Sequence, residues 1–264
     1  MNKIKKAFIC LMSIILFAVP IITMPTPVYA ASSVNAYNWY AKRNADHTLP
    51  KLEKQFEFIR QYDAFYGNEN AAKNNEKVIY LTFDAGYENG NIEKILDTLK
   101  KHNVPAAFFV LENLVKRNTD LVKRMADDGH LICNHTSTHP DMTKLSDKAK
   151  FDLQLSSLNA LIKEKCGVEC AKFYRPPEGR FSEQNLEFAK ELGYKTVFWS
   201  FAYADWDNNR QPTNEYAIKK IMDNIHPGQI MLLHPTSKTN AEILDQVLTL
   251  IKKEGYRFGC LTEI

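Results

Sequence analysis

Hydrophobic and polar positions follow two periods along the chain from Lys77 onward. Short runs of β-branched and aromatic residues predict strands. Seven such runs occur, at 77–83, 105–110, 130–134, 171–175, 195–201, 228–234 and 256–260. Between most of them lie segments with the apolar spacing of an amphipathic helix, at 91–102, 111–129, 145–165, 182–193, 214–225 and 240–255. Alternating strands and helices predict parallel strands joined by right-handed crossovers, and this favours a deformed (β/α)7-type barrel.

The first 76 residues do not follow this alternation. Three lysines precede an apolar run at 7–22, and small residues at 28–30 suit a signal peptidase. We therefore expect an export signal at 1–30, with an uncleaved membrane anchor as the alternative. Residues 31–76 are polar and aromatic, with one helical-looking stretch at 51–67. They predict an N-terminal extension wrapped on a core domain at 77–264, not a second domain.

Composition excludes several classes of protein. With 45% hydrophobic and 25% charged residues, the chain has the make-up of a globular protein, and a net charge of +3 is too small to predict nucleic-acid binding. No glycine-rich nucleotide-binding loop follows any predicted strand. The absence of a CxxC pair gives no support to a thiolate metal site.

Four cysteines remain after the expected cleavage, too few for a disulfide scaffold in a domain of this size. Cys166 and Cys170 flank a probable loop and could bridge locally. Cys133 and Cys260 fall in apolar runs, which predicts buried free thiols.

Five reactive side chains fall at or just past the ends of different predicted strands: Asp84, His135, Arg175, Asp205 and His234. In a parallel barrel the carboxyl ends of the strands meet on one face, where active sites are built. The sequence therefore predicts that these five residues converge on one pocket.

A histidine pair suggests a metal. His135 and His139 are four residues apart, and on a helical turn both imidazoles would point to one side, as two metal ligands do. The alternative is a pair of capping or surface histidines. Asp84 could cap the following helix, but several residues intervene, so a general base is the better interpretation.

The remaining candidates form a second group. Arg175 is either a surface charge or a buried partner that lowers the pKa of an Asp, and the two prolines after it stiffen the next loop. Paired with Asp205, His234 would be a general acid oriented through its second nitrogen; alone it could be a core histidine. Trp206 could belong to the core or to a ligand platform.

The ordered motifs TFDAG, HTSTH, RPPEG, DW and LLH resemble those of the polysaccharide deacetylases, the NodB-homology carbohydrate esterases of family 4. The resemblance spans residue 77 to about residue 260. YENGN after the first motif and HPTSKTNAEIL at the last are similar to the branch that deacetylates N-acetylmuramic acid in peptidoglycan, towards muramic δ-lactam in the spore cortex.

The resemblance implies a NodB-homology barrel and metal-assisted hydrolysis of an acetamide. His135 and His139 would hold a divalent metal, usually zinc, that polarises the acetamide carbonyl. Asp84 would be the base. The backbone N–H of Glu178 would help to stabilise the oxyanion.

Further roles follow from the same resemblance. Arg175 would hold the Asp84 carboxylate, and His234, tuned by Asp205, would protonate the leaving amine. Most of the family has a second carboxylate, a metal ligand, where this chain has Ala85. We therefore expect weaker metal binding with more bound water, and Asp141 is a candidate additional ligand.

The resemblance also bears on substrate and partners. Tyr87 and Trp206 are candidates for gripping glycan, and Arg180 for binding the lactyl carboxylate of muramic acid. The expected partner is a peptide-stripped glycan strand prepared by an amidase, outside the cell, with the protein a monomer. Two alternatives stay open: a general chitin or N-acetylglucosamine deacetylase, and an inactive wall-binding module, which Ala85 would favour.

Overall fold

The computed structural model describes residues 34–43 and 46–264, so the expected export signal lies outside the described residues. Strands form a curled parallel sheet in the order β10-β3-β4-β5-β6-β8-β2, with β9 also paired to β3. Their bounds are β2 (Ala64–Phe65), β3 (Val78–Ala85), β4 (Ala106–Val110), β5 (Leu131–Asn134), β6 (Ala171–Tyr174), β8 (Lys195–Val197), β9 (Gln229–Leu233) and β10 (Arg257–Phe258). All seven predicted strands are confirmed, and β2 is an additional one.

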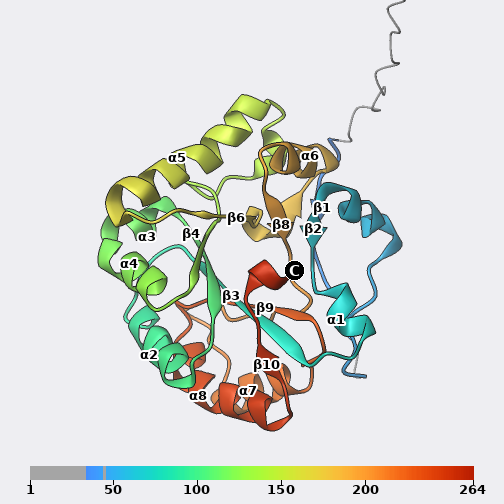
Figure 1. Cartoon of the computed structure of the whole chain (residues 1–264), viewed down its shortest axis with the longest axis vertical. Helices are drawn as coiled ribbons and strands as arrows, with labels where there is room; N and C mark the ends of the chain where they lie inside the picture. Colours follow the sequence, from blue (N-terminus) through green and yellow to red (C-terminus); the bar gives the residue numbers. More distant parts are fainter. Residues whose placement is uncertain (1–33, 44–45) are drawn as a thin grey trace, which may run out of the picture. The chain divides into compact units, whose positions relative to one another are not determined.

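Two isolated bridges bring the far end of the sheet back to β9. Phe201, beyond β8, bridges to Met231, and Gly67, beyond β2, bridges to Gln229. The sheet therefore curls into the expected deformed barrel, with its helices arranged around the strands (Figure 1).

The helices follow the predicted periodicity with three differences, the first of which is an additional short helix at Glu69–Lys73. They are α1 (Glu69–Lys73), α2 (Ile92–His102), α3 (Glu112–Arg117), α4 (Thr119–Asp127), α5 (Lys148–Cys166), α6 (Glu183–Glu191), α7 (Asn214–Met222) and α8 (Lys238–Lys253). The predicted helix at 111–129 is two helices, because Asn118 between them has a non-helical backbone with φ of −133°. The helical-looking stretch at 51–67 forms a 3-10 helix, η1 (Lys54–Tyr62), instead of an α-helix.

Successive side chains of β3 point alternately to the outer helices and to the inside of the barrel. Ile79, Leu81 and Phe83 pack with the surrounding helices, whereas Val78 and Tyr80 belong to a second apolar cluster inside the barrel. Because successive side chains of a strand point to opposite faces, Asp84 shares the inner face with Tyr80. The strand therefore delivers this carboxylate to the mouth of the barrel.

Part of the segment before β3 packs against the barrel. β1 (Tyr37–Asn38) pairs with β7 (Arg180–Phe181) in a two-stranded antiparallel sheet. Trp39 and Phe56 share an apolar cluster with Phe198. The segment predicted as an extension thus contributes one strand, β2, to the main sheet. No helix within the described residues is long and apolar enough to cross a membrane.

The four described cysteines are all free, so the local Cys166–Cys170 bridge does not form in this structure. Cys133 is buried, as predicted. The prediction is wrong for Cys260, which is only half-buried because it follows the short edge strand β10.

Gly228, just before β9, lies in close contact with the backbone of Asn68, just before α1. Gly228 has φ of +72°, and a Cβ there would lie 2.2 Å from the carbonyl oxygen of Asn68. Gly129 has φ of +86° but nothing within 4 Å of the same position. Both Gly→Ala variants should lose about 1–2 kcal/mol from the left-handed backbone. Gly228→Ala should lose clearly more free energy of unfolding in a denaturant titration; equal losses in both variants would contradict this contact.

Candidate active site

A cavity of about 560 Å³ opens where the strands of the barrel end. It is lined by Asp84, His135, His139, Glu178, Gly179, Trp199, Ala202, Tyr203, Trp206, Leu232 and His234. Six of the ten predicted site residues are therefore brought to one cavity. Arg175 and Asp205 lie behind its wall, fully buried. Tyr87 and Arg180 are not among the lining residues.

Arg175 holds Asp84. Its Nη1 donates to Asp84 Oδ1 over 2.7 Å, and its Nη2 donates to Thr82 Oγ1 over 2.9 Å. Its Nε donates to the Val197 carbonyl over 3.0 Å, and the guanidinium lies 4.1 Å from the ring centre of Phe109. The side chain is 0% exposed, so the surface-charge alternative is wrong.

This pair keeps Asp84 ionised. Burial would raise the pKa of the Asp84 carboxyl, but the charge of Arg175, followed by those of His135 and His234, outweighs burial and lowers it. A buried carboxylate that stays charged and faces the cavity is suited to accept a proton.

The two histidines meet in an irregular loop. The predicted helical turn is wrong, because Thr136 and His139 have φ of +74° and +56°, which no helix allows. The imidazole rings of His135 and His139 nevertheless lie 5.0 Å apart. Hydrogen bonds to neighbouring elements hold this loop: Ser137 N donates to the Gln154 carbonyl of α5 over 2.9 Å, and Thr136 N donates to Asn134 Oδ1 over 2.8 Å.

His135 is prepared to act as a ligand. Its Nδ1 must carry a proton, because its partner at 2.8 Å is the carbonyl oxygen of Arg175. The lone pair of a neutral His135 therefore sits on Nε2, 3.6 Å from Asp84 Oδ2. Burial lowers the pKa of His135 to about 4, against the opposing charge of Asp84, so the ring is neutral at physiological pH. A hydrogen-bonded second nitrogen and a neutral ring are typical of metal-binding histidines.

The donor set fits a divalent metal through two imidazoles. The described part of the chain contains no group of three His, Cys, Asp or Glu side chains that could hold a metal. Ala85 is fully buried in the outer apolar cluster. Asp141 does not line the cavity; its carboxylate accepts from Thr143 and lies 3.3 Å from Arg180 Nε.

Asp205 and His234 form the second pair. His234 Nδ1 lies 2.7 Å from Asp205 Oδ1, and the backbone N–H of His234 donates to Oδ2 over 2.8 Å. Burial alone would lower the pKa of His234, but the charge and hydrogen bond of Asp205, with the charge of Asp84, outweigh it and raise the pKa. The imidazole is thus stabilised in its protonated form, and its Nε2 is available as an acid. The lone core-histidine alternative is wrong, because His234 lines the cavity.

The double-proline loop supplies the opposite wall. Glu178 and Gly179 both have left-handed φ, +57° and +66°, within the short 3-10 segment η3 (Pro177–Gly179). Both residues line the cavity.

Two exposed aromatic residues lie on loops that are joined by a hydrogen bond, and one of them, Trp206, lines the cavity. Trp206 is 59% exposed and its ring centre lies 6.1 Å from that of His234, so Trp206 is not a core residue. Tyr87 is also exposed, and its hydroxyl accepts a hydrogen bond from Asn208 Nδ2 over 2.5 Å. This bond ties the loop after β3 to the loop that carries Trp206.

Two functional neighbours were missed by the sequence reasoning. Thr82, which accepts from Arg175, stands two positions before Asp84 on the same strand face, and the two-residue period could have identified it. Asn240 Nδ2 donates to Asp205 Oδ2 over 2.6 Å from the first turns of α8. No local signal links Asn240 to Asp205, because their contact is made only by the fold.

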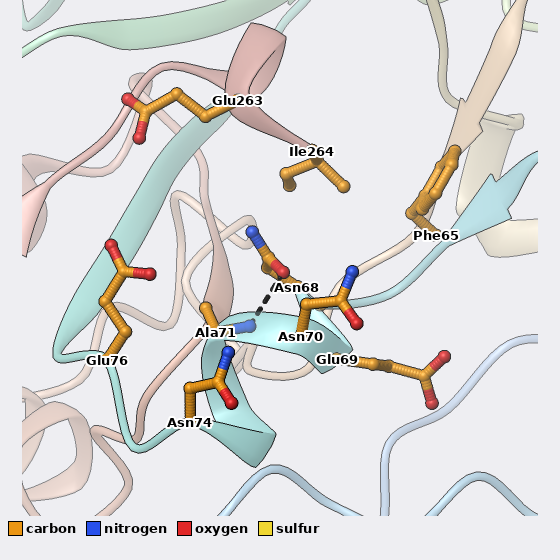
Figure 2. Close-up of a pocket in the computed structure, with 10 residues that line it drawn as sticks. Phe65, Asn68, Glu69, Asn70, Ala71, Asn74, Glu76, Glu263 and Ile264 are labelled. Atoms are coloured by element: carbon orange, nitrogen blue, oxygen red, sulfur yellow. Dashed lines mark hydrogen bonds between the residues drawn. The ribbon is translucent and has the colours of Figure 1, made fainter.

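A second cavity, of about 300 Å³, lies between α1 and the end of the chain (Figure 2). Its lining residues are Phe65, Gly67, Asn68, Glu69, Asn70, Ala71, Asn74, Glu76, Glu263 and Ile264. Its acidic side chains are already paired: Glu69 with Arg60 at 2.6 Å, and Glu76 and Glu263 with Arg257 at 2.5 and 2.8 Å. None of the predicted site residues lines it, so the chemistry belongs to the larger cavity.

A carboxylate held by a buried arginine, a histidine paired with a second carboxylate and two neighbouring imidazoles at the mouth of a (β/α) barrel form the arrangement expected of a hydrolase. The polysaccharide deacetylase family model matches residues 71–197. The chain is 46% identical over 230 residues to the peptidoglycan-N-acetylmuramic acid deacetylase PdaA of Bacillus subtilis, covering 86% of this chain and 85% of PdaA. The solved structure of PdaA, a family 4 carbohydrate esterase, gives a TM-score of 0.82 at 44% identity, over 88% of this chain and 97% of that one.

Two further relatives differ in activity. A peptidoglycan-N-acetylglucosamine deacetylase of Bacillus cereus is 33% identical, over 78% of this chain and 73% of its own length. A family 4 pseudoenzyme from Bacillus anthracis gives a TM-score of 0.68 at 30% identity, over 76% of this chain and 68% of its own. The chain belongs to the polysaccharide deacetylases, the carbohydrate esterases of family 4.

The Asp205–His234 pair predicts a measurable shift. In Asp205→Asn the favourable charge is lost while burial remains, so the pKa of His234 should fall from above to below the ordinary value of about 6.5. Titration of the imidazole by NMR in metal-free protein measures this. Asp207→Asn is the matched control. Asp207 lies in the same loop but pairs with Arg210, so its replacement should leave the pKa of His234 unchanged. An unshifted His234 in Asp205→Asn would refute the pairing.

Proposed function

We propose that the protein hydrolyses the N-acetyl group of N-acetylmuramic acid in peptidoglycan and releases acetate, as a step towards muramic δ-lactam in the spore cortex. The observation that carries the proposal is that Asp84 and His234, each paired with a buried group of opposite charge, line the same cavity. Asp84 is held as a base by Arg175, and His234 is held as an acid by Asp205. The similarity to PdaA over most of both chains supports this substrate.

The residues divide the reaction between them. Asp84 accepts a proton from the attacking water, while Arg175 keeps the carboxylate oriented. The backbone N–H of Glu178 donates to the oxygen that becomes negative as the carbonyl carbon turns tetrahedral. His234 then gives a proton to the amine nitrogen as the C–N bond breaks. The products are acetate and a free amino sugar.

His135 and His139 would hold a divalent metal, zinc in our proposal, which would supply Lewis-acid polarisation of the acetamide. Only two protein ligands are expected, because Ala85 cannot coordinate. Metal binding should therefore be weaker than in relatives with a carboxylate at this position.

We further propose that the protein acts outside the cell as a monomer, after cleavage of the signal at 1–30, on strands from which an amidase has removed the peptides. Trp206 lines the cavity, and Tyr87 lies on a loop that is hydrogen-bonded to the loop of Trp206, so we assign both residues to sugar binding. Domain bounds of 31–76 for the extension and 77–264 for the catalytic domain remain our prediction.

Two other functions have support from the comparisons. The Bacillus cereus relative suggests activity on N-acetylglucosamine, and the pseudoenzyme suggests an inactive wall-binding protein. Mature protein should be incubated with zinc and either peptide-stripped peptidoglycan, intact peptidoglycan or chitooligosaccharides, and acetate assayed. We expect release chiefly from the stripped glycan, lost with a chelator and restored by zinc. Release chiefly from chitooligosaccharides would favour the first alternative, and no release the second.

The acid and base roles predict large losses of rate. Asp84→Asn and His234→Ala should each lower kcat by about 100- to 10,000-fold, because each removes a proton-transfer group. Acetate release on stripped glycan measures kcat, and thermal melting checks the fold. Activity within a few-fold of wild type in a folded variant would remove the role assigned to that residue.

Arg180 is our candidate for the lactyl carboxylate. It lies outside the lining of the cavity and faces Asp141, with its side chain 41% exposed, so substrate would have to compete with Asp141. Arg180→Ala should reduce the preference for stripped glycan over uncharged chitooligosaccharides, because a carboxylate partner is lost. Arg210→Ala, an exposed arginine paired within its own loop, is the control. An unchanged preference would show that Arg180 is a solvated loop charge with no part in substrate choice.

A further inference from the structure

The N-terminal segment reaches the back of the loop that carries Glu178. The backbone N–H of Trp39 donates to the Gly179 carbonyl over 2.8 Å. Its indole Nε1 donates to the Trp199 carbonyl over 2.9 Å. Trp39 is 6% exposed and does not line the cavity, whereas both of its acceptor residues do. The segment is thus one layer away from the reacting groups.

This loop needs support. Glu178 and Gly179 are consecutive left-handed residues, and the left-handed region costs a residue with a Cβ about 1–2 kcal/mol. Packing around Gly179 is tight: a Cβ added there would lie 2.6 Å from the Trp199 ring and 3.1 Å from Trp39 Cβ. The turn is therefore enclosed between two tryptophans.

The same segment holds the chain that leaves the loop. Asn38 pairs with Arg180 and Tyr37 pairs with Phe181 in the two-stranded sheet. The Trp39 ring stacks on Phe198, with ring centres 4.5 Å apart. Loop and segment are thus connected by backbone pairing, an indole hydrogen bond and aromatic packing.

We infer that Trp39 is a positioning residue that fixes the backbone N–H of Glu178 in its donating orientation, so that the N-terminal segment contributes to the reaction through this one residue. This inference rests on the proposed oxyanion role of Glu178. Trp39 touches no substrate; it acts through Gly179 and Trp199. A donor displaced from the developing negative charge loses its contribution to the transition state more than its contribution to substrate binding.

Two variants of Trp39 should lower kcat by different amounts. Trp39→Phe removes the indole donor but keeps a ring to stack on Phe198, and Trp39→Ala removes both. Loss of one whole oxyanion donor costs about 100- to 1,000-fold in kcat, so a displaced donor should cost less. We expect kcat on stripped glycan to fall about fivefold in Trp39→Phe and about 30-fold or more in Trp39→Ala, with KM and zinc affinity within twofold of wild type.

Tyr40 provides the matched control. It is the next residue, but its ring is 45% exposed and packs on Phe56, and its hydroxyl accepts from Gln55. Tyr40→Ala should therefore leave kcat unchanged. A second readout needs no activity: hydrogen exchange of the peptide spanning 176–182 should be faster in both Trp39 variants and unchanged in Tyr40→Ala.

The outcomes separate the two claims. Wild-type kcat in the folded Trp39→Phe and Trp39→Ala variants, with unaltered exchange at 176–182, would overturn the inference. A rise in KM by the same factor as the fall in kcat would also overturn it, because that pattern indicates a general disturbance of the cavity that also weakens substrate binding. If the wild-type protein releases no acetate from any glycan, the proposed function fails, and the exchange measurement alone decides whether Trp39 holds the loop.

Discussion

The site depends on one buried guanidinium. Arg175 is removed from water, so each of its polar groups needs a partner inside the protein, and those partners come from several strands. It reaches Asp84 and Thr82 on β3 and the carbonyl groups of Val197 and Phe198 at the end of β8, while its own carbonyl accepts from His135 Nδ1. One residue thereby lowers the pKa of Asp84, orients the imidazole of His135 and links the ends of β3 and β8.

The imidazole of His234 is held by a negative charge, the carboxylate of Asp205. Asp205 is a buried carboxylate whose oxygens are occupied by His234 and Asn240, and it stabilises an imidazolium instead of acting on substrate. Two carboxylates in one barrel therefore have different roles because their partners differ: a permanent cation holds Asp84, and a titratable ring holds Asp205.

Much of this could be predicted from the sequence, because the strands are short, strongly apolar and separated by clear helical periods. A polar residue after each strand is enough to place Asp84, His135 and His234 on one face of a parallel barrel. The conformation of the histidine loop was not predictable, since positive φ at Thr136 and His139 depends on hydrogen bonds to α5. Contacts between distant segments, such as that of the N-terminal residues with the double-proline loop, likewise carry no local signal.

The central claim is that this geometry acts on the acetamide of muramic acid. The most direct test is mass analysis of the sugars in peptide-stripped peptidoglycan after treatment with the mature protein and zinc, with digestion to fragments that separate the two amino sugars. The account predicts that acetyl groups are lost from muramic acid and retained on glucosamine. Loss from glucosamine, or from both sugars equally, would contradict it.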